Sequence, residues 1–151
     1  MINEIIERIA FHEAGHVLLA IQFEIHFESA WISEKTGGGE VKMRCSPHER
    51  DYPLTDNKLG GFCMFYAAGA AAEMFINDSY DREGSSHDMR MHKLCIDRSP
   101  SLNYSWEESV KKAKSFIIFD DLKKISKRLV SNSEITFPES YEILGKKLPW
   151  D

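Results

Sequence analysis

Two histidines and a glutamate at close spacing are the residues of this chain best suited to chemistry. They lie in His12-Glu13-Ala14-Gly15-His16, within a helix expected from Ile2 to Phe23. A helix turns about 100° per residue, so His12 and His16 lie on one face and can hold one metal ion. Zinc favours imidazole ligands, and its catalytic sites keep one position for water. The pattern predicts a zinc site in which Glu13 takes a proton from the water and passes it to a leaving amine.

The surroundings of this motif support a site rather than a chance match. A histidine on a helix is usually a half-buried amphipathic residue, and the motif alone recurs by chance in about one in a few hundred chains of this length. Here it lies in phase with a strongly amphipathic pattern that includes Ile5, Ile9 and Val17. Gly15 costs about 1 kcal/mol against alanine in mid-helix, which indicates a close approach of another backbone or of a substrate.

The whole chain has the composition of one globular domain, which we take to span residues 1–151. It is 42% hydrophobic and 28% charged, with a net charge of −5. Its basic residues form no long cluster except at Lys111 to Lys114 and Lys123 to Arg128. We therefore expect no nucleic-acid partner.

Cysteine usage and hydropathy predict a cytoplasmic protein. Cys45, Cys63 and Cys95 are odd in number and widely spaced, which is typical of reduced thiols. We expect no signal peptide, because the N-terminal segment is amphipathic and lacks a continuous apolar core. The long apolar run Leu59 to Ile76 contains Glu73 and small residues, which favours a buried helix over membrane insertion.

Further elements are expected along the chain, in this order: a β-hairpin from residues 26–33 and 40–45 around Gly37-Gly38-Gly39; a loop from Pro47 to Thr55; a helix capped by Thr55 or Asp56; a polar loop from Asn77 to Ser86; a helix starting close to His87-Asp88 and capped by serines; helical runs from Trp106 to Phe119 and Asp121 to Leu129; and a last short helix starting at Ile135 to Glu139. The small residues of the second helix favour close packing against the first. The fold class predicted is mostly α (α+β).

These segments together resemble the peptidase domain of the FtsH family, the membrane-anchored AAA zinc proteases. The resemblance is carried by the His12 to His16 motif, the hairpin from Ser29 to Met43, Ala68 to Glu73, Gly84 to Asp88, and Phe119 to Leu144. It implies a zincin-like helical metallopeptidase domain with a small β-hairpin or sheet near the active site. It also implies that an aspartate, here Asp88, is the third zinc ligand.

The chain departs from that family in several features. It contains no Walker phosphate loop and no transmembrane helix, so we expect neither ATP binding nor a membrane anchor. The family's Gly-Gly-Arg before its Ala-Ala-Glu stands here as Ala68-Gly69-Ala70. The pattern therefore indicates a stand-alone form, and leaves a homo-oligomer open.

Two carboxylates compete for the place of third ligand. Asp88 is preferred, because it has the resemblance and a loop-to-helix position that can bring a short carboxylate to the metal. Glu73 lies in an apolar helix and fits better as a partner that hydrogen-bonds a ligating histidine. By default His87 is a solvated neighbour, and His26, His48 and His92 are surface or packing residues.

Two functions remain open at this point. The first is a zinc-dependent endopeptidase acting on unfolded or flexible protein, with Glu13 as general base and with an edge strand of the hairpin able to pair with an extended peptide. The second is a catalytically silent binding or regulatory module with the same fold, or a peptidase subunit that depends on a separate ATPase. The intact His12, Glu13, His16 and Asp88 favour the first.

Overall fold

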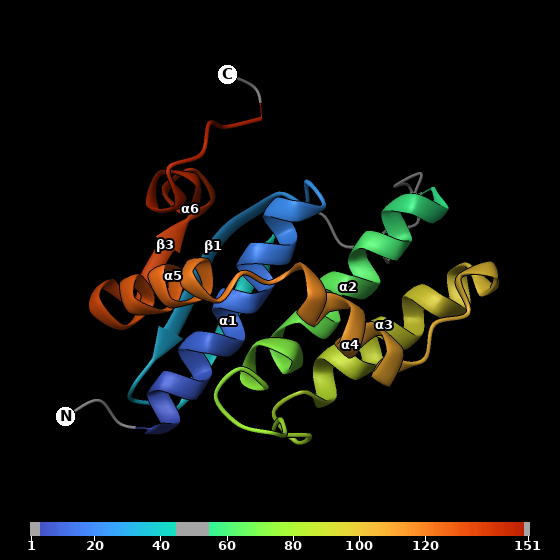
Figure 1. Ribbon diagram of the computed structural model, residues 1–151, viewed down its shortest axis with the longest axis horizontal. Helices are drawn as coiled ribbons and strands as arrows, with labels where there is room; N and C mark the ends of the chain where they lie inside the picture. Colours follow the sequence, from blue (N-terminus) through green and yellow to red (C-terminus); the bar gives the residue numbers. More distant parts are fainter. Residues whose placement is uncertain (1–3, 45–54, 150–151) are drawn as a thin grey trace.

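A computed structural model describes residues 4–44 and 55–149. Outside these residues lie Cys45 and most of the predicted Pro47 to Thr55 loop, which includes His48. Thr55 itself is described. The fold is mostly helical with a small antiparallel sheet, which confirms the predicted class (Figure 1). The elements are α1 Glu4–Gln22, β1 Phe27–Ser33, β2 Gly38–Met43, α2 Asp56–Glu73, α3 Ser86–Arg98, the 3-10 turn η1 Pro100–Leu102, α4 Trp106–Phe116, α5 Phe119–Asn132, β3 Glu134–Thr136 and α6 Phe137–Leu144.

Helix α1 is the central element of the core, and α2 and α5 both pack against it. The predicted close approach of α1 and α2 is confirmed at Gly15. A Cβ atom there would lie 2.5 Å from the carbonyl oxygen of Ala68 and 2.6 Å from the Cβ of Ala72, so only glycine fits. The apolar length of α2 is buried almost throughout, with Thr55 as its N-cap accepting a hydrogen bond from the backbone of Lys58. The two helices thus hold the His12 to His16 segment against small residues.

The predicted hairpin is present as β1 and β2, and a third strand extends it. Strand order is β2-β1-β3, with all pairs antiparallel, so β2 is an edge strand. Strand β3 was not predicted, because Ile135 to Glu139 was interpreted only as the start of a helix. In the structure Ile135 pairs with Ala30, and Thr136 then caps α6 through a capping box with Glu139.

The later helices differ from the prediction at two ends. The run predicted to continue to Phe119 stops at Phe116, because Ile117 and Ile118 adopt extended backbone conformations, and Phe119 begins α5. Helix α3 begins at Ser86, with Asp88 in its first turn as predicted. Ser85 occupies its N-cap position, but the expected side-chain capping hydrogen bond is not made.

No helix among the described residues has both the length and the apolar character to cross a bilayer.

Candidate metal centre

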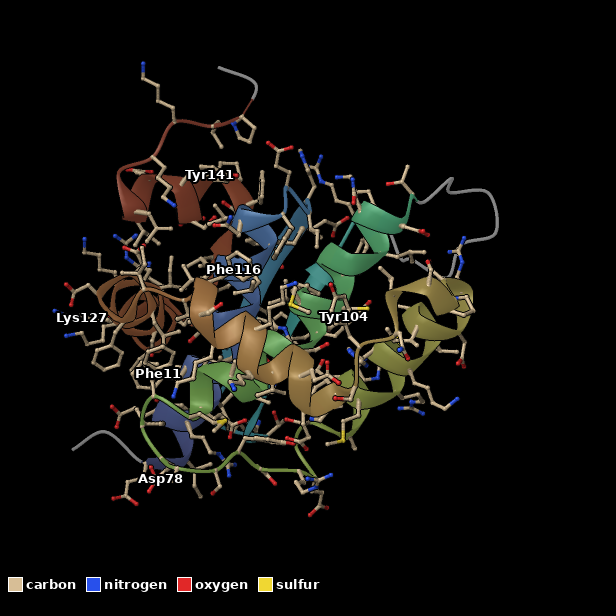
Figure 2. All side chains as sticks on the ribbon, turned by 45° about the vertical axis from the view of Figure 1, so that its right-hand side comes forward. Phe11, Asp78, Tyr104, Phe116, Lys127 and Tyr141 are labelled. Carbon is tan, nitrogen blue, oxygen red and sulfur yellow. The ribbon has the colours of Figure 1, made fainter. Side chains whose placement is uncertain are left out.

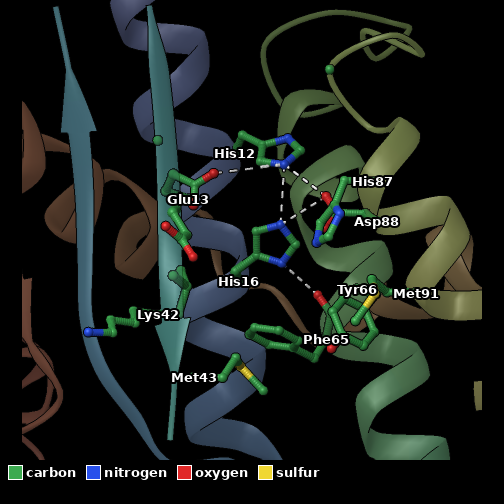
Figure 3. A pocket seen from close by; sticks show the side chains of 14 residues that line it. His12, Glu13, His16, Lys42, Met43, Phe65, Tyr66, His87, Asp88 and Met91 are labelled. Carbon is green, nitrogen blue, oxygen red and sulfur yellow. Dashed lines mark hydrogen bonds and ion pairs between the residues drawn. The ribbon is translucent and has the colours of Figure 1, made fainter. Parts of the chain in front are cut away.

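Three potential metal ligands from two helices converge at one point (Figure 3). His12 and His16 come from α1, and Asp88 comes from the first turn of α3. The two imidazole Nε2 atoms lie 3.2 Å apart, and the Oδ2 atom of Asp88 lies 3.0 Å from that of His12 and 3.1 Å from that of His16. His16 and Asp88 are buried, and His12 is nearly so.

The separations of these three atoms match the needs of a tetrahedral ion. Zinc binds nitrogen and oxygen at about 2.0–2.2 Å, so two ligands of a tetrahedral site lie about 3.3–3.5 Å apart. The observed separations of 3.0 to 3.2 Å require shifts of only a few tenths of an ångström. Two imidazoles and one carboxylate are also a donor set that zinc favours in catalytic sites. The residues therefore fit this metal.

Glu73 orients His12 from the opposite side of its ring. The Nδ1–H group of His12 donates to Oε2 of Glu73 at 2.9 Å, which leaves Nε2 as the nitrogen facing His16 and Asp88. The other oxygen of Glu73 lies 3.6 Å from Nε of Arg8 and accepts from the backbone of Asp81 at 3.4 Å. Arg8 also bridges to Asp81 at 3.3 Å. Glu73 thus contacts the far side of the ring, whereas Asp88 lies at the ligating side.

A backbone carbonyl orients His16. Its Nδ1–H group donates to the carbonyl oxygen of Phe65, on α2, at 2.7 Å. This contact again fixes the ring so that Nε2 faces the centre, and Nε2 can bind a cation once it has lost its proton. Both imidazoles are therefore held in the same orientation by residues of α2.

The pKa values of the three clustered side chains are shifted from their ordinary values. Burial opposes the charge on His12, but hydrogen bonds to Asp88 and Glu73 outweigh it and raise the pKa of His12 to about 10. Burial likewise opposes the charge on His16, and Asp88 nevertheless raises its pKa. The two imidazoles, despite the opposing effect of burial, lower the pKa of Asp88. The carboxylate is thus held ionised, which is the form that binds a cation.

Glu13 lies beside the ligands but outside their set. Its Oε1 atom is 4.0 Å from Nε2 of His12, and its Oε2 atom is buried without a hydrogen-bond partner. Burial raises the pKa of Glu13, which moves this carboxyl toward the range suited to proton transfer near neutral pH. Gly39 of β2 covers it so closely that a Cβ atom there would lie 2.9 Å from Cγ of Glu13.

A cavity of about 360 Å³ opens at the ligands. Its walls include Gly39 to Met43 of β2, so the edge strand runs along the site, as Figure 3 shows. Phe65, Tyr66 and Met91 give it an apolar end, and burial raises the pKa of Tyr66 so that its hydroxyl stays protonated. The arrangement can accommodate an extended chain beside the three ligands and Glu13.

The other histidines among the described residues do not belong to the three converging groups. His87 is exposed at the rim of the cavity, next to Asp88. His92 is buried, with its Nε2 atom 2.8 Å from Oγ of Ser109 and its ring against Trp106. Its burial lowers its pKa. His26 stacks on Phe137.

Sequence reasoning did not identify three contributors to the site. The backbone carbonyl of Phe65 could not be identified as an acceptor from residue type, since every residue has a backbone carbonyl. Arg8 was indistinguishable from a solvated helix residue, although its position four before His12 places it on the same face. Gly39 was taken only as part of a turn.

No family model matches the chain, and no curated protein matches it either. The functional assignment therefore rests on the geometry of this site.

Proposed function

We propose that this chain is a zinc-dependent metalloendopeptidase that hydrolyses peptide bonds in unfolded or flexible polypeptides, in a cytoplasmic setting. The observation that carries the proposal is the convergence of Nε2 of His12, Nε2 of His16 and Oδ2 of Asp88 within 3.2 Å of one another, beside the carboxylate of Glu13. The resemblance of the same residues to the FtsH peptidase domain supports it. The free thiols of Cys63 and Cys95 are compatible with a reducing compartment.

Each residue has a separate role in this proposal. His12, His16 and Asp88 would hold the ion, which when bound supplies a Lewis acid that polarises the scissile carbonyl and makes water more acidic. Glu13 accepts a proton from the attacking water and delivers it to the leaving amine nitrogen. Its burial and raised pKa suit it to hold that proton between the two transfers. Glu73 and the Phe65 carbonyl keep the imidazoles oriented.

The substrate class follows from the edge strand. Strand β2 has β1 on one side, and its other edge faces the cavity. An extended peptide can add to such an edge through backbone hydrogen bonds, without requiring a particular sequence. Opening a stable domain costs about 5–15 kcal/mol, which binding at one cleft does not supply, so segments that are already extended are the expected substrates.

The test separates metal binding from chemistry. Glu13→Gln keeps the size of the side chain and removes the base, so the variant should retain about one zinc per chain while cleavage of an unfolded protein falls by about 10²–10⁴-fold. Glu40→Gln is the matched control, because Glu40 is another carboxylate that lines the same cavity. Zinc content is measured by metal analysis, and cleavage with and without a chelator.

Two outcomes would contradict the proposal. Undiminished cleavage by Glu13→Gln would remove Glu13 from the mechanism. A wild-type protein that holds zinc and cleaves no unfolded substrate would instead be the silent binding module, or a subunit that requires a separate ATPase.

A further inference from the structure

Positive charge is concentrated on α4 and α5, neither of which carries a candidate metal ligand. Residues 106–132, which span α4 and α5, carry seven lysines and arginines and four acidic residues. The remainder of the chain carries twelve basic and twenty acidic residues. The chain is acidic overall, but residues 106–132 are basic, so the charge is distributed unevenly along the chain.

Apolar side chains are exposed where these two helices meet. Phe116, Ile118 and Phe119 are 37%, 62% and 40% exposed, and they are three of the five large hydrophobic side chains exposed among the described residues. Ile118 is the most exposed of the five. We call these three residues, with Lys114 and Lys123, the junction patch. In Figure 1 the link between α4 and α5 crosses in front of α1, so the backbone of this link lies on the near side of the molecule in that view.

Two lysines are held at the rim of this apolar surface by aromatic rings. The ring of Phe75 stacks on that of Phe119, with centroids 5.5 Å apart and planes 6° apart. The ammonium of Lys114 lies 5.3 Å from the Phe75 centroid, and that of Lys123 lies 4.8 Å from the Phe119 centroid. The cations therefore lie beside the exposed rings, where their stems cover apolar surface.

More cations extend outward along α5. Lys127 follows Lys123 by four residues and so lies on the same side of the helix. Figure 2 shows the Lys127 side chain reaching away from the molecule. Two acidic residues, Asp120 and Asp121, follow Phe119 in the first turn of α5, and Asp120 lies 3.3 Å from the ammonium of Lys123 and offsets part of its charge.

We propose that the junction patch docks this protein on an anionic lipid surface. Exposed apolar side chains ringed by lysines are the arrangement with which peripheral proteins enter the headgroup region of a bilayer. The apolar tips of Ile118 and Phe119 enter the boundary of the acyl chains, and the lysines contact the lipid phosphates. A lipid surface is favoured over an acidic protein because hydrocarbon accepts protruding side chains without a matching pocket for each.

The test measures binding to phosphatidylcholine vesicles with and without phosphatidylserine, by cosedimentation at several salt concentrations. Wild-type protein should bind only the anionic vesicles, and less as salt rises. A lysine near an anionic surface changes partitioning by roughly fivefold, so Lys114→Gln with Lys123→Gln should lower it by about 20-fold. Ile118→Ser should lower it by about tenfold, through lost apolar burial. Asp120→Asn should raise it severalfold, because it frees Lys123.

Matched controls lie elsewhere on the surface. Leu94→Ser removes another exposed apolar side chain, on α3, and Lys35→Gln removes a lysine in the turn between β1 and β2, and neither should change binding. Absence of binding to anionic vesicles would overturn the proposal, as would equal losses in the controls. Self-association, or capture of an acidic protein, that Ile118→Ser abolishes without any vesicle binding would assign the patch to a protein partner instead, and would also overturn it.

Discussion

Gly69→Ala is the substitution that most directly tests how α2 supports the metal centre. An alanine Cβ at this position would lie 2.7 Å from Cδ2 of His12, and closer still to Cε1 and to the ligating Nε2. Ordinary contact begins at 3.4 Å, so the ring would have to withdraw by about 1 Å. Because Glu73 and Asp88 hold the ring at 2.9 and 3.0 Å, withdrawal breaks one of these contacts or both.

The effect should fall on metal affinity far more than on folding. Displacing a ligand by about 1 Å disrupts coordination, and loss of the orienting contact alone costs about 10–100-fold in metal affinity, so we expect a loss of at least about 100-fold. Alanine favours the helix by about 1 kcal/mol, whereas overpacking costs about 1–3 kcal/mol. The net cost is therefore at most about 2 kcal/mol against a stability of about 5–15 kcal/mol, so the variant should fold.

The assay is a competition between the protein and a chelating dye for zinc, with thermal unfolding of the metal-free protein as the check on folding. Gly60→Ala is the control, since it lies in the same helix and its Cβ would meet only Leu102, at an ordinary 3.7 Å. If Gly69→Ala bound zinc as tightly as Gly60→Ala, the reasoning about His12 would be refuted.

Three further outcomes are expected. Gly39→Ala should retain zinc and lose hydrolysis, because the new Cβ would meet Glu13 and the backbone oxygen of Trp31 and not the candidate ligands; parallel loss of zinc would contradict this. Asp88→Ala should lower zinc affinity by at least about 100-fold and Glu73→Ala by about 10–100-fold, and the reverse order in the dye competition would exchange their roles. Burial lowers the pKa of His92 below its ordinary 6.5, so on acidification protons bind first to the unfolded chain. The free energy of unfolding of the wild type, measured by denaturant unfolding, should therefore fall relative to that of His92→Gln as the pH drops below 6.5. A difference between the two proteins that does not depend on pH would refute this.

Local patterns in the sequence were sufficient for the elements that carry the histidines. The helical period around His12 and His16 predicts α1, and the small residues around Ala68 predict its close packing with α2. The alternation around the glycine turn predicts β1 and β2. In each case the signal lies within one continuous segment, so no knowledge of distant partners was needed.

Strand β3 shows why other parts could not be predicted. It is only three residues long, and its formation depends on Ile135 pairing with Ala30, more than a hundred positions earlier. Thr136 also serves as N-cap of α6 in the structure, so the strand and the helix start share residues. The sequence analysis identified only the start of the helix.

The sequence favoured Asp88 over Glu73 as the third ligand, but the residues alone did not give the geometry that distinguishes the two carboxylates. Either carboxylate could reach a helical histidine, and only the direction of approach distinguishes them. Asp88 comes to Nε2 of both imidazoles, whereas Glu73 comes to Nδ1 of His12. That difference depends on where α3 begins relative to α2, which is a property of the packed structure.

The environment of Glu13 supports the proposal that this residue takes part in chemistry, because its burial does not favour folding. Glu13 is 6% exposed, and one of its oxygens has no hydrogen-bond partner. A buried polar atom without a partner costs about 1–3 kcal/mol, and burial of an ionised carboxylate costs more. Unlike Glu73, whose two oxygens are both engaged, Glu13 contributes no hydrogen bond that would offset this cost. A chain under selection for stability alone would favour an apolar residue there, so a destabilising carboxylate beside three converging candidate ligands supports the proposed role of Glu13 as a base that acts on water.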